Sequence, residues 1–277
     1  MTYQEAYTNG MIILSEYGIC NAKLDARLLL EYVGQLSLHD IFAHGERELS
    51  EELWKSYEGL LHERGTHVPL QYLTGEQEFM GLSFVVNKHV LIPRQDTEFL
   101  VEEGLLHIYD GMKLLDICTG SGCILLSAMH YKNDCSGVGV DISKMALEVA
   151  RTNAKNLGIQ AEFMESDLLE KVQGKFDVVF SNPPYIRSEL IDTLMEEVRD
   201  HEPRLALDGL EDGLFFYRRI VDGVRQHMNR GGYLLLEIGH DQSVSVSHLM
   251  EKAGFTHVEV QKDYAGNDRV VKGMYIE

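Results

Sequence analysis

The chain has 277 residues, of which 44% are hydrophobic and 25% are charged, a composition typical of a globular protein that is comfortably long enough for two domains. Its formal net charge of −19 at pH 7 argues against a general nucleic-acid binder, because such proteins need a basic surface to displace counterions from phosphates. No apolar run is long enough to span a bilayer. The first ten residues lack the basic-then-apolar order of a secretory signal, so we expect a cytoplasmic protein.

The four cysteines are Cys20, Cys118, Cys123 and Cys135. They form neither a CxxC pair nor a Cys/His cluster with zinc spacing, and the histidines are scattered along the chain. We therefore predict free thiols in a reducing compartment and no metal site.

Residues 1–75 have the pattern of a helical domain. The range 50–65 begins with Ser50, a residue type that caps helix N-termini, and it ends at Gly65. The range 21–34 shows the same helical spacing, which predicts one apolar, buried face. The residues expected on that face are Leu24, Leu28 and Leu29.

The next segment, 76–94, is rich in β-branched and aromatic residues and is broken by Gly81, which predicts a β-hairpin that links two domains. From residue 95 to residue 277, apolar strands alternate with helices. The expected strands are 113–117, 137–141, 161–166, 176–181 and 231–239, followed by 257–261 and 269–277. This alternation predicts an α/β domain with a doubly wound, mostly parallel sheet. Ligands of such sheets bind beyond the carboxyl ends of the strands.

A glycine-rich turn follows the first of these strands. Gly120 and Gly122 allow a tight turn in which backbone approaches a ligand closely, and the next helix begins with its N–H groups facing that ligand. Asp141 ends the second strand, where a carboxylate can accept hydrogen bonds from both hydroxyls of a ribose. The combination indicates a nucleoside cofactor.

The run from Asp116 to Gly122 resembles the first motif of S-adenosylmethionine-dependent methyltransferases, an acidic residue followed by G-x-G-x-G. Cys118 stands where the first glycine is usual, and we interpret it as a packing residue rather than a nucleophile. The resemblance also places Asp167, near the end of the third strand, beside the adenine; a solvated turn aspartate is the alternative.

The fourth strand ends in the stretch SNPPYI, residues 181–186. Proline fixes φ and has no N–H, and it forces the preceding residue into extended geometry, so Asn182 and Pro183 are held with little freedom. The Asn182 side-chain oxygen and the Pro183 carbonyl are two acceptors that can receive both hydrogens of a planar –NH₂ group. Tyr185 can lie against the π face of that group. We therefore predict that Asn182, Pro183, Pro184 and Tyr185 orient a weakly nucleophilic amide or amine nitrogen for methylation.

The tetrapeptide alone fits methyltransferases that act on DNA bases, on RNA guanine or on protein glutamine. Further segments resemble the HemK/PrmC family, the peptide chain release factor glutamine N(5)-methyltransferases. They are LIPRQDTEFLVEEGL (91–105), VPLQYLTGEQEFMGLSF (68–84), HEPRLALDGLEDGL (201–214), LLLEIGHDQ (234–242) and DYAGNDRVV (263–271). Gln95 stands where the family often has proline, and Leu168 where it often has tryptophan.

This resemblance implies a class I, Rossmann-like methyltransferase domain over 95–277, joined by the hairpin 76–94 to an N-terminal domain, 1–75, that recognises the substrate. The implied cofactor is S-adenosylmethionine, and the implied substrate is the glutamine of the Gly-Gly-Gln motif in class 1 release factors. Implied cofactor contacts are Asp116, Cys118, Thr119, Gly120, Ser121, Gly122, Asp141, Asp167, Leu168 and Asn182. Implied substrate contacts are Asn182, Pro183, Pro184 and Tyr185, with Arg94 and Glu98 closing over the site or, alternatively, only capping a helix and forming salt bridges.

Two other functions stay open from the sequence. A DNA adenine-N6 or RNA amino-methyltransferase would need a basic recognition region, which the acidic residues 1–75 do not supply. A scaffold that binds the cofactor without catalysis is disfavoured by the intact NPPY tetrapeptide. We expect a monomer without direct nucleic-acid or membrane contacts, steered by its acidic charge toward a basic release factor.

Overall fold

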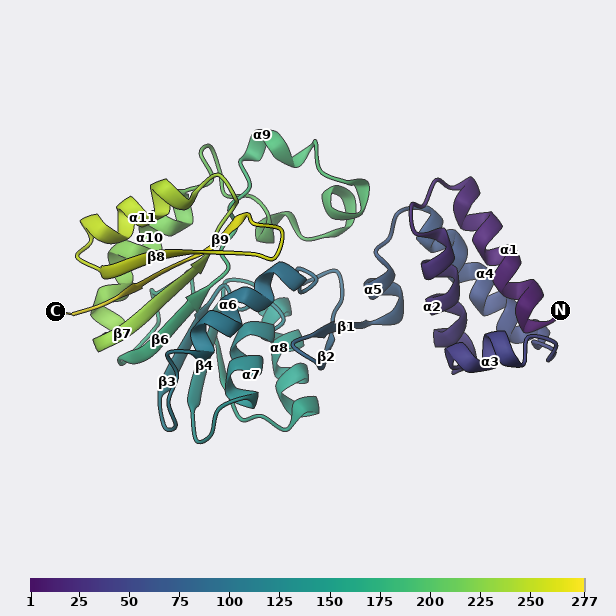
Figure 1. Ribbon diagram of the computed structural model, residues 1–277, viewed down its shortest axis with the longest axis horizontal. Helices are drawn as coiled ribbons and strands as arrows, with labels where there is room; N and C mark the ends of the chain where they lie inside the picture. Colours follow the sequence, from purple (N-terminus) through teal and green to yellow (C-terminus); the bar gives the residue numbers. More distant parts are fainter. Residues whose placement is uncertain (277) are drawn as a thin grey trace. The chain divides into compact units, whose positions relative to one another are not determined.

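The structure, a computed structural model, describes residues 1–276. It consists of two compact units (Figure 1). The first unit holds Met1–Glu76 together with Met195–His201, and the second holds Gln77–Leu194 and the chain from Glu202 onward. The short segment Met195–His201 thus belongs to the first unit although it lies far along the sequence.

The first unit is helical. Its helices are α1 (Tyr3–Glu16), α2 (Ala22–Gly34), α3 (Leu38–Ala43), α4 (Glu51–Gly65) and α5 (Leu70–Thr74), with a π-helical turn at Glu197–His201. Ser50 caps α4 by accepting a hydrogen bond from the Leu53 N–H, as the sequence predicts. Tyr57 is fully buried at the centre of the unit, and its hydroxyl donates to the Ala26 carbonyl at 2.9 Å. These contacts fix α4 against α2.

The expected apolar face of α2 is wrong at one position. Leu24 is 46% exposed, whereas Asp25 is buried on the face that also holds Leu29. Asp25 takes this place because its carboxylate pairs with the buried guanidinium of Arg64 at 2.7 Å. The same guanidinium also pairs with Glu197 of the π-helical turn. The buried face of α2 therefore holds one half of an ion pair as well as apolar side chains.

The second unit begins with the predicted β-hairpin, formed by β1 (Glu76–Phe79) and β2 (Leu82–Val85). Met80 and Gly81 make its turn with positive φ. The rings of Phe79 and Phe84 are buried in the core of this unit. The hairpin is thus anchored in the second unit by two aromatic side chains.

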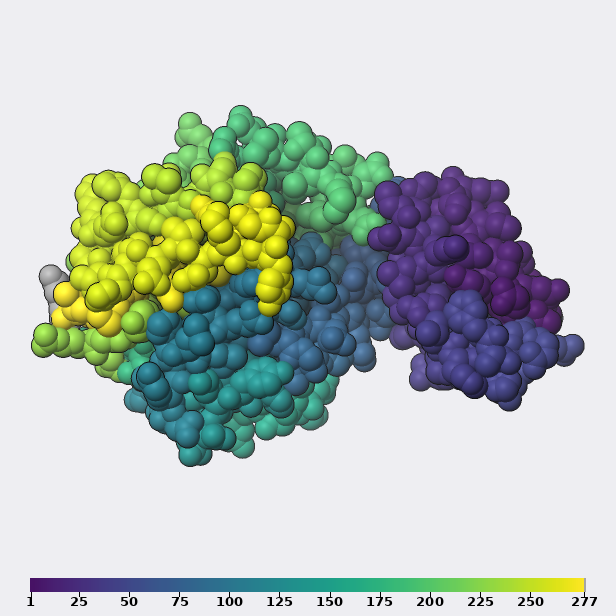
Figure 2. Space-filling view, in the orientation of Figure 1, coloured from purple at the N-terminus to yellow at the C-terminus, as the bar shows by residue number. Residues whose placement is uncertain are grey.

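The expected doubly wound sheet is confirmed. Seven strands lie in the order β5-β4-β3-β6-β7-β9-β8, all parallel except β9, which is antiparallel to both of its neighbours. The strands are β3 (Lys113–Ile117), β4 (Ser136–Asp141), β5 (Glu162–Glu165), β6 (Phe176–Ser181), β7 (Met228–Glu237), β8 (Thr256–Lys262) and β9 (Asp268–Met274). The C-terminal strands β8 and β9 form one edge of the sheet and reach the surface of the unit (Figure 2).

Helices cover both faces of the sheet (Figure 1). They are α6 (Gln95–Leu105), α7 (Cys123–His130) and α8 (Lys144–Leu157) on one face, α10 (Phe215–Val224) and α11 (Ser243–Lys252) on the other, with short turns at α9 (Ser188–Ile191), Arg204–Ala206 and Arg225–His227. Side chains alternate along β3, so that Leu114 faces one core and Leu115 the other. No helix among the described residues is long and apolar enough to cross a membrane.

The strand order reverses between β3 and β6. The last residues of these two strands, Ile117 and Ser181, are direct partners in the ladder, and the Ser181 hydroxyl donates to the Ile117 carbonyl at 2.7 Å. The glycine-rich turn and the NPPY tetrapeptide therefore leave the sheet side by side. This is the switch point at which doubly wound sheets bind ligands.

Candidate active site

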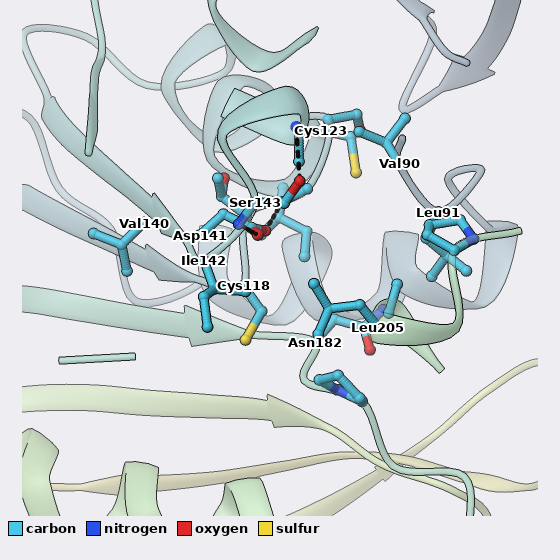
Figure 3. A pocket seen from close by; sticks show the side chains of 18 of the residues that line it. Val90, Leu91, Cys118, Cys123, Val140, Asp141, Ile142, Ser143, Asn182 and Leu205 are labelled. Atoms are coloured by element: carbon cyan, nitrogen blue, oxygen red, sulfur yellow. Dashed lines mark hydrogen bonds between the residues drawn. The ribbon is translucent and has the colours of Figure 1, made fainter. Parts of the chain in front are cut away.

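A cavity of about 240 Å³ lies beyond the carboxyl ends of β3, β4 and β6, within the second unit (Figure 3). Cys118, Asp141 and Asn182, one from each of these strand ends, lie around it. Of the residues that the sequence predicts for the site, those lining the cavity are Arg94, Cys118, Thr119, Gly120, Ser121, Asp141, Asp167, Leu168, Asn182 and Pro184. Those that do not line it are Glu98, Asp116, Gly122, Pro183 and Tyr185.

The turn after β3 has the conformation that its glycines permit. Gly120 and Gly122 have φ of +54° and +80°, and the Gly122 N–H donates to the Thr119 carbonyl at 2.8 Å. Asp116 lies beneath the turn, fully buried, and accepts a 2.6 Å hydrogen bond from the Thr119 hydroxyl. Burial raises the pKa of Asp116 to about 7. Asp116 thus holds the turn from below instead of facing the cavity.

Cys118 adopts the left-handed conformation, with φ of +62°, which explains why glycine would be usual there. Its side chain lies at the wall of the cavity. Burial raises the pKa of the thiol well above its ordinary value. A protonated thiol is a poor nucleophile, so the chemistry of this site does not favour a catalytic Cys118.

Asp141 joins two backbone segments at the cavity. Its Oδ2 accepts a hydrogen bond from the Gly120 N–H and its Oδ1 accepts one from the Ser143 N–H, both at 2.9 Å. Burial raises the pKa of this carboxyl. Because each carboxylate oxygen has more than one lone pair, Asp141 keeps acceptor capacity toward the cavity.

The segment after β5 supplies Asp167 and Leu168. Asp167 accepts a 2.9 Å hydrogen bond from the Arg219 guanidinium of α10, which also lines the cavity. Leu168 has φ of +50° and is 7% exposed, with its side chain in the core that α10 and α11 cover. The cavity wall here is therefore aliphatic at the position where the family often has tryptophan.

The NPPY tetrapeptide is divided between the cavity and the core. Asn182 faces the cavity, and its Nδ2 donates to the Thr97 hydroxyl at 3.3 Å. Both prolines are buried, and only Pro184 touches the cavity. Tyr185 points away from it: the hydroxyl donates to the Glu237 carboxylate at 3.4 Å, and the carbonyl accepts from Gln242.

Arg94 and Glu98 lie in different environments. Arg94 lines the cavity and pairs with Glu202, whose side chain is almost completely buried. Glu98 accepts a 2.6 Å hydrogen bond from the Met80 N–H at the hairpin turn and does not face the cavity. Of the two, only Arg94 is placed to close over a ligand.

Several lining residues were not predicted from the sequence. Ile142 and Ser143 directly follow Asp141, so the strand end itself was the signal for them. Six others come from α6, from α10 and from the segment after Glu202, where nothing local marks them; they are Thr97, Pro203, Leu205, Ala206, Phe216 and Arg219. The rest come from the segment before α6, from β4, α7 and α8, and from the residue after β5; they are His89, Val90, Leu91, Pro93, Cys123, Ile124, Val140, Ala146 and Ser166.

Models of known protein families match both the N-terminal helical part of the chain and the part that forms the doubly wound sheet. Residues 5–75 match the model of the PrmC N-terminal domain, and residues 95–210 match that of the methyltransferase small domain. A release factor glutamine methyltransferase of Clostridium acetobutylicum is 42% identical over 254 residues, 89% of each chain. Another, of Caulobacter vibrioides, is 40% identical over 279 residues, 99% of this chain and 96% of that one.

A solved methyltransferase from Pyrococcus furiosus shares the fold, with a TM-score of 0.55 at 19% identity over 71% of this chain and 90% of that one. The doubly wound sheet and the matched methyltransferase domain define a class I methyltransferase, a class that uses S-adenosylmethionine. The chain belongs to the release factor glutamine methyltransferase family.

Proposed function

We propose that this enzyme transfers a methyl group from S-adenosylmethionine to the side-chain amide nitrogen of the glutamine in the Gly-Gly-Gln motif of class 1 release factors. The names of its relatives support the reaction and the substrate. The observation that carries the proposal is the position of Asn182, an amide-bearing side chain at the cavity wall, level with the glycine-rich turn.

The residues that line the cavity suit the cofactor. In the proposal, Asp141 accepts hydrogen bonds from the ribose, and the glycine turn from Cys118 to Gly122 lies against the amino-acid part. Leu168 and Asp167 lie at the adenine, with Leu168 giving aliphatic contact. S-adenosylmethionine supplies an electrophilic methyl group on a sulfonium.

Asn182 and the tetrapeptide would position the substrate. The Asn182 oxygen and the Pro183 carbonyl each accept a hydrogen bond from one N–H of the glutamine carboxamide. These two hydrogen bonds direct its nitrogen toward the methyl group. The nitrogen forms the new C–N bond, the C–S electrons stay with sulfur, and the nitrogen loses a proton to water. Orientation of this kind can contribute up to about 7–11 kcal/mol in ideal cases.

Residues 1–75, which form most of the helical first unit, would recognise the release factor, and Arg94 would close over the site. We propose that the enzyme acts as a cytoplasmic monomer without direct contacts to nucleic acid or membrane. The acidic net charge of −19 supports a protein substrate with a basic surface over nucleic acid.

Mass spectrometry tests the proposal directly. The full chain is incubated with S-adenosylmethionine and a class 1 release factor, and the peptides are analysed. We expect one added methyl group on the motif glutamine, and none on a release factor in which that glutamine is replaced by alanine. Methylation of duplex DNA or RNA, with the release factor unmodified, would refute the proposal.

A further inference from the structure

Glu202 is a buried carboxylate beside the cavity, directly before a short turn that carries several of the lining residues. Its side chain is 2% exposed, and it does not line the cavity itself. The residues after it include Pro203, Leu205 and Ala206, which do line the cavity. The reaction proposed above gives Glu202 no role. Because burying a carboxylate is costly unless it is paired, its partners indicate what this side chain does.

Both oxygens of this carboxylate bind the chain segment that precedes α6. The Oε1 atom forms an ion pair with the guanidinium of Arg94, and the Oε2 atom accepts a buried hydrogen bond from the Ile92 N–H at 3.4 Å. These partners lie 108 and 110 positions before Glu202 in the sequence. Glu202 therefore joins two parts of the chain that are distant in sequence.

The two parts that Glu202 joins both line the cavity. Residues 89–91 and 93–94 line it from the segment before α6, and residues 203 and 205–206 line it from the turn after Glu202. Leu91 and Leu205, one from each part, are among the lining residues in Figure 3. Neither part is a strand of the sheet, so no ladder of hydrogen bonds fixes its position. The position of each part depends instead on contacts such as those of Glu202.

Proline stiffens the backbone next to these contacts. Ile92 precedes Pro93 and Glu202 precedes Pro203, and a residue before proline is restricted to extended geometry. Each proline also has a fixed φ. A stiff segment moves as a unit, so contacts at Ile92 and Arg94 also fix the residues beside them that line the cavity.

We propose that Glu202 is a positioning residue, which fixes the segment before α6 relative to the turn Arg204–Ala206 and thereby slows release of the bound cofactor. This inference rests on the proposed function, in which S-adenosylmethionine occupies this cavity. Because Glu202 does not line the cavity, it acts through Arg94 and the Ile92 N–H and not by contact with the cofactor.

The two partners differ in burial, and this difference determines how the pair is best broken. The Arg94 side chain is 40% exposed, so its guanidinium can turn to water when Glu202 loses its charge. Removal of the guanidinium instead leaves a buried carboxylate without its cationic partner, which is the more destabilising change. Glu202→Gln therefore loosens the lining segments with the smaller effect on folding, and Arg94→Gln tests the same pair from the other side.

The test measures dissociation of labelled S-adenosylmethionine from the full-length chain, chased with excess unlabelled cofactor and without a release factor. Glu202→Gln keeps an oxygen for the Ile92 N–H but loses the charge-assisted bond to Arg94. We expect it to raise the dissociation rate by about tenfold, and Arg94→Gln to raise it at least as much. Because the two side chains act as a pair, adding Glu202→Gln to Arg94→Gln should raise the rate further by less than about twofold.

Glu103→Gln is the matched control, since it removes the charge of an α6 carboxylate that pairs with the buried Lys272 at 3.0 Å and does not line the cavity. It should keep the wild-type dissociation rate. The inference is overturned if either Glu202→Gln or Arg94→Gln releases the cofactor at the wild-type rate. It is also overturned if Glu202→Gln has its full effect in the Arg94→Gln background, as a merely structural role would give. A wild type that binds the cofactor but does not methylate release factors would refute the proposed function instead.

Discussion

The backbone N–H of Gly120 donates a 2.9 Å hydrogen bond to Oδ2 of Asp141. The bond ties the turn after β3 to the end of β4, so a single carboxylate both shapes the glycine turn and faces the cavity. In the proposed function, binding of the cofactor would therefore depend on the same side chain as the conformation of the turn.

Asp141→Ala should weaken binding of S-adenosylmethionine by about 10–100-fold, because a hydrogen bond to a charged group contributes about 1.5–3 kcal/mol. Isothermal titration calorimetry measures the change. Asp222→Ala, at an exposed aspartate of α10, is the control and should bind normally. A normal titration of Asp141→Ala would remove Asp141 from the cofactor site.

Asn182→Ala should cut kcat by about 10²–10³, as the loss of one preorganised hydrogen-bonding group does at an oxyanion hole. Cofactor affinity should stay mostly intact, because other residues from the turn and from β4 also line the cavity. Single-turnover methylation at saturating cofactor measures the step. Asn156→Ala, on the exposed side of α8, is the control; an unchanged rate in Asn182→Ala would exclude a catalytic role.

Gly104 lies where α6 crosses β6, and a Cβ atom there would lie 2.2 Å from the Phe180 ring. Gly104→Ala should therefore destabilise the protein by about 1–3 kcal/mol through overpacking. A Cβ atom added at Gly59, in α4, would meet nothing within 4 Å, and Gly59→Ala should stabilise the protein by about 0.5–1 kcal/mol. Urea unfolding of both variants should show changes of opposite sign in the free energy of unfolding. Equal changes would show that the close packing of Gly104 against Phe180 does not contribute to stability.

Asp25→Ala leaves the buried Arg64 guanidinium without one of its two carboxylate partners. Loss of one partner from a buried ion pair should lower the free energy of unfolding by about 3 kcal/mol. Lys55→Ala breaks an exposed ion pair with Glu51 on the same unit and should change it by less than about 0.5 kcal/mol. Chemical denaturation compares the two, and similar losses would contradict the role given to Asp25.

Ionic strength should affect the encounter with the substrate. Release factors work against ribosomal RNA, so we expect a basic surface on them, and this chain carries a net charge of −19. Between low and high salt, kcat/KM should fall by about tenfold, whereas kcat at saturating release factor should change little. A kcat/KM that is indifferent to salt would show that charge does not steer the encounter.

The sequence was sufficient to locate the strand ends. Buried parallel strands are apolar runs, and the breaks after them fall on Gly120, Asp141 and Asn182, which the structure brings to one cavity. Local pattern could not identify Thr97, because a threonine in the first turn of a helix carries no sign of what it faces. Only the packing of α6 against β6 places its hydroxyl beside Asn182.

The directions of two charged side chains, Asp25 and Glu98, have a similar explanation. Leu24 was expected inside, but Asp25 is buried because Arg64, 39 positions further along, supplies its partner. Glu98 was expected either to close over the site or only to cap a helix and form salt bridges, and its carboxylate accepts a hydrogen bond from the Met80 N–H of the hairpin turn. In both cases a partner distant in sequence determines the direction of a charged side chain, and periodicity carries no information about such partners.

The segment Met195–His201, which contains the π-helical turn, has a consequence for how this protein can be divided into fragments. Glu196 and Glu197 pair with His67 and Arg64, so residues far along the chain complete the helical unit. No single cut in the gene can release either unit whole, since a fragment beginning at Gln77 would carry away part of the other. A chimera that takes its N-terminal region from a relative would therefore have to take residues 195–201 from the same relative. The two stretches of the first unit must be exchanged together.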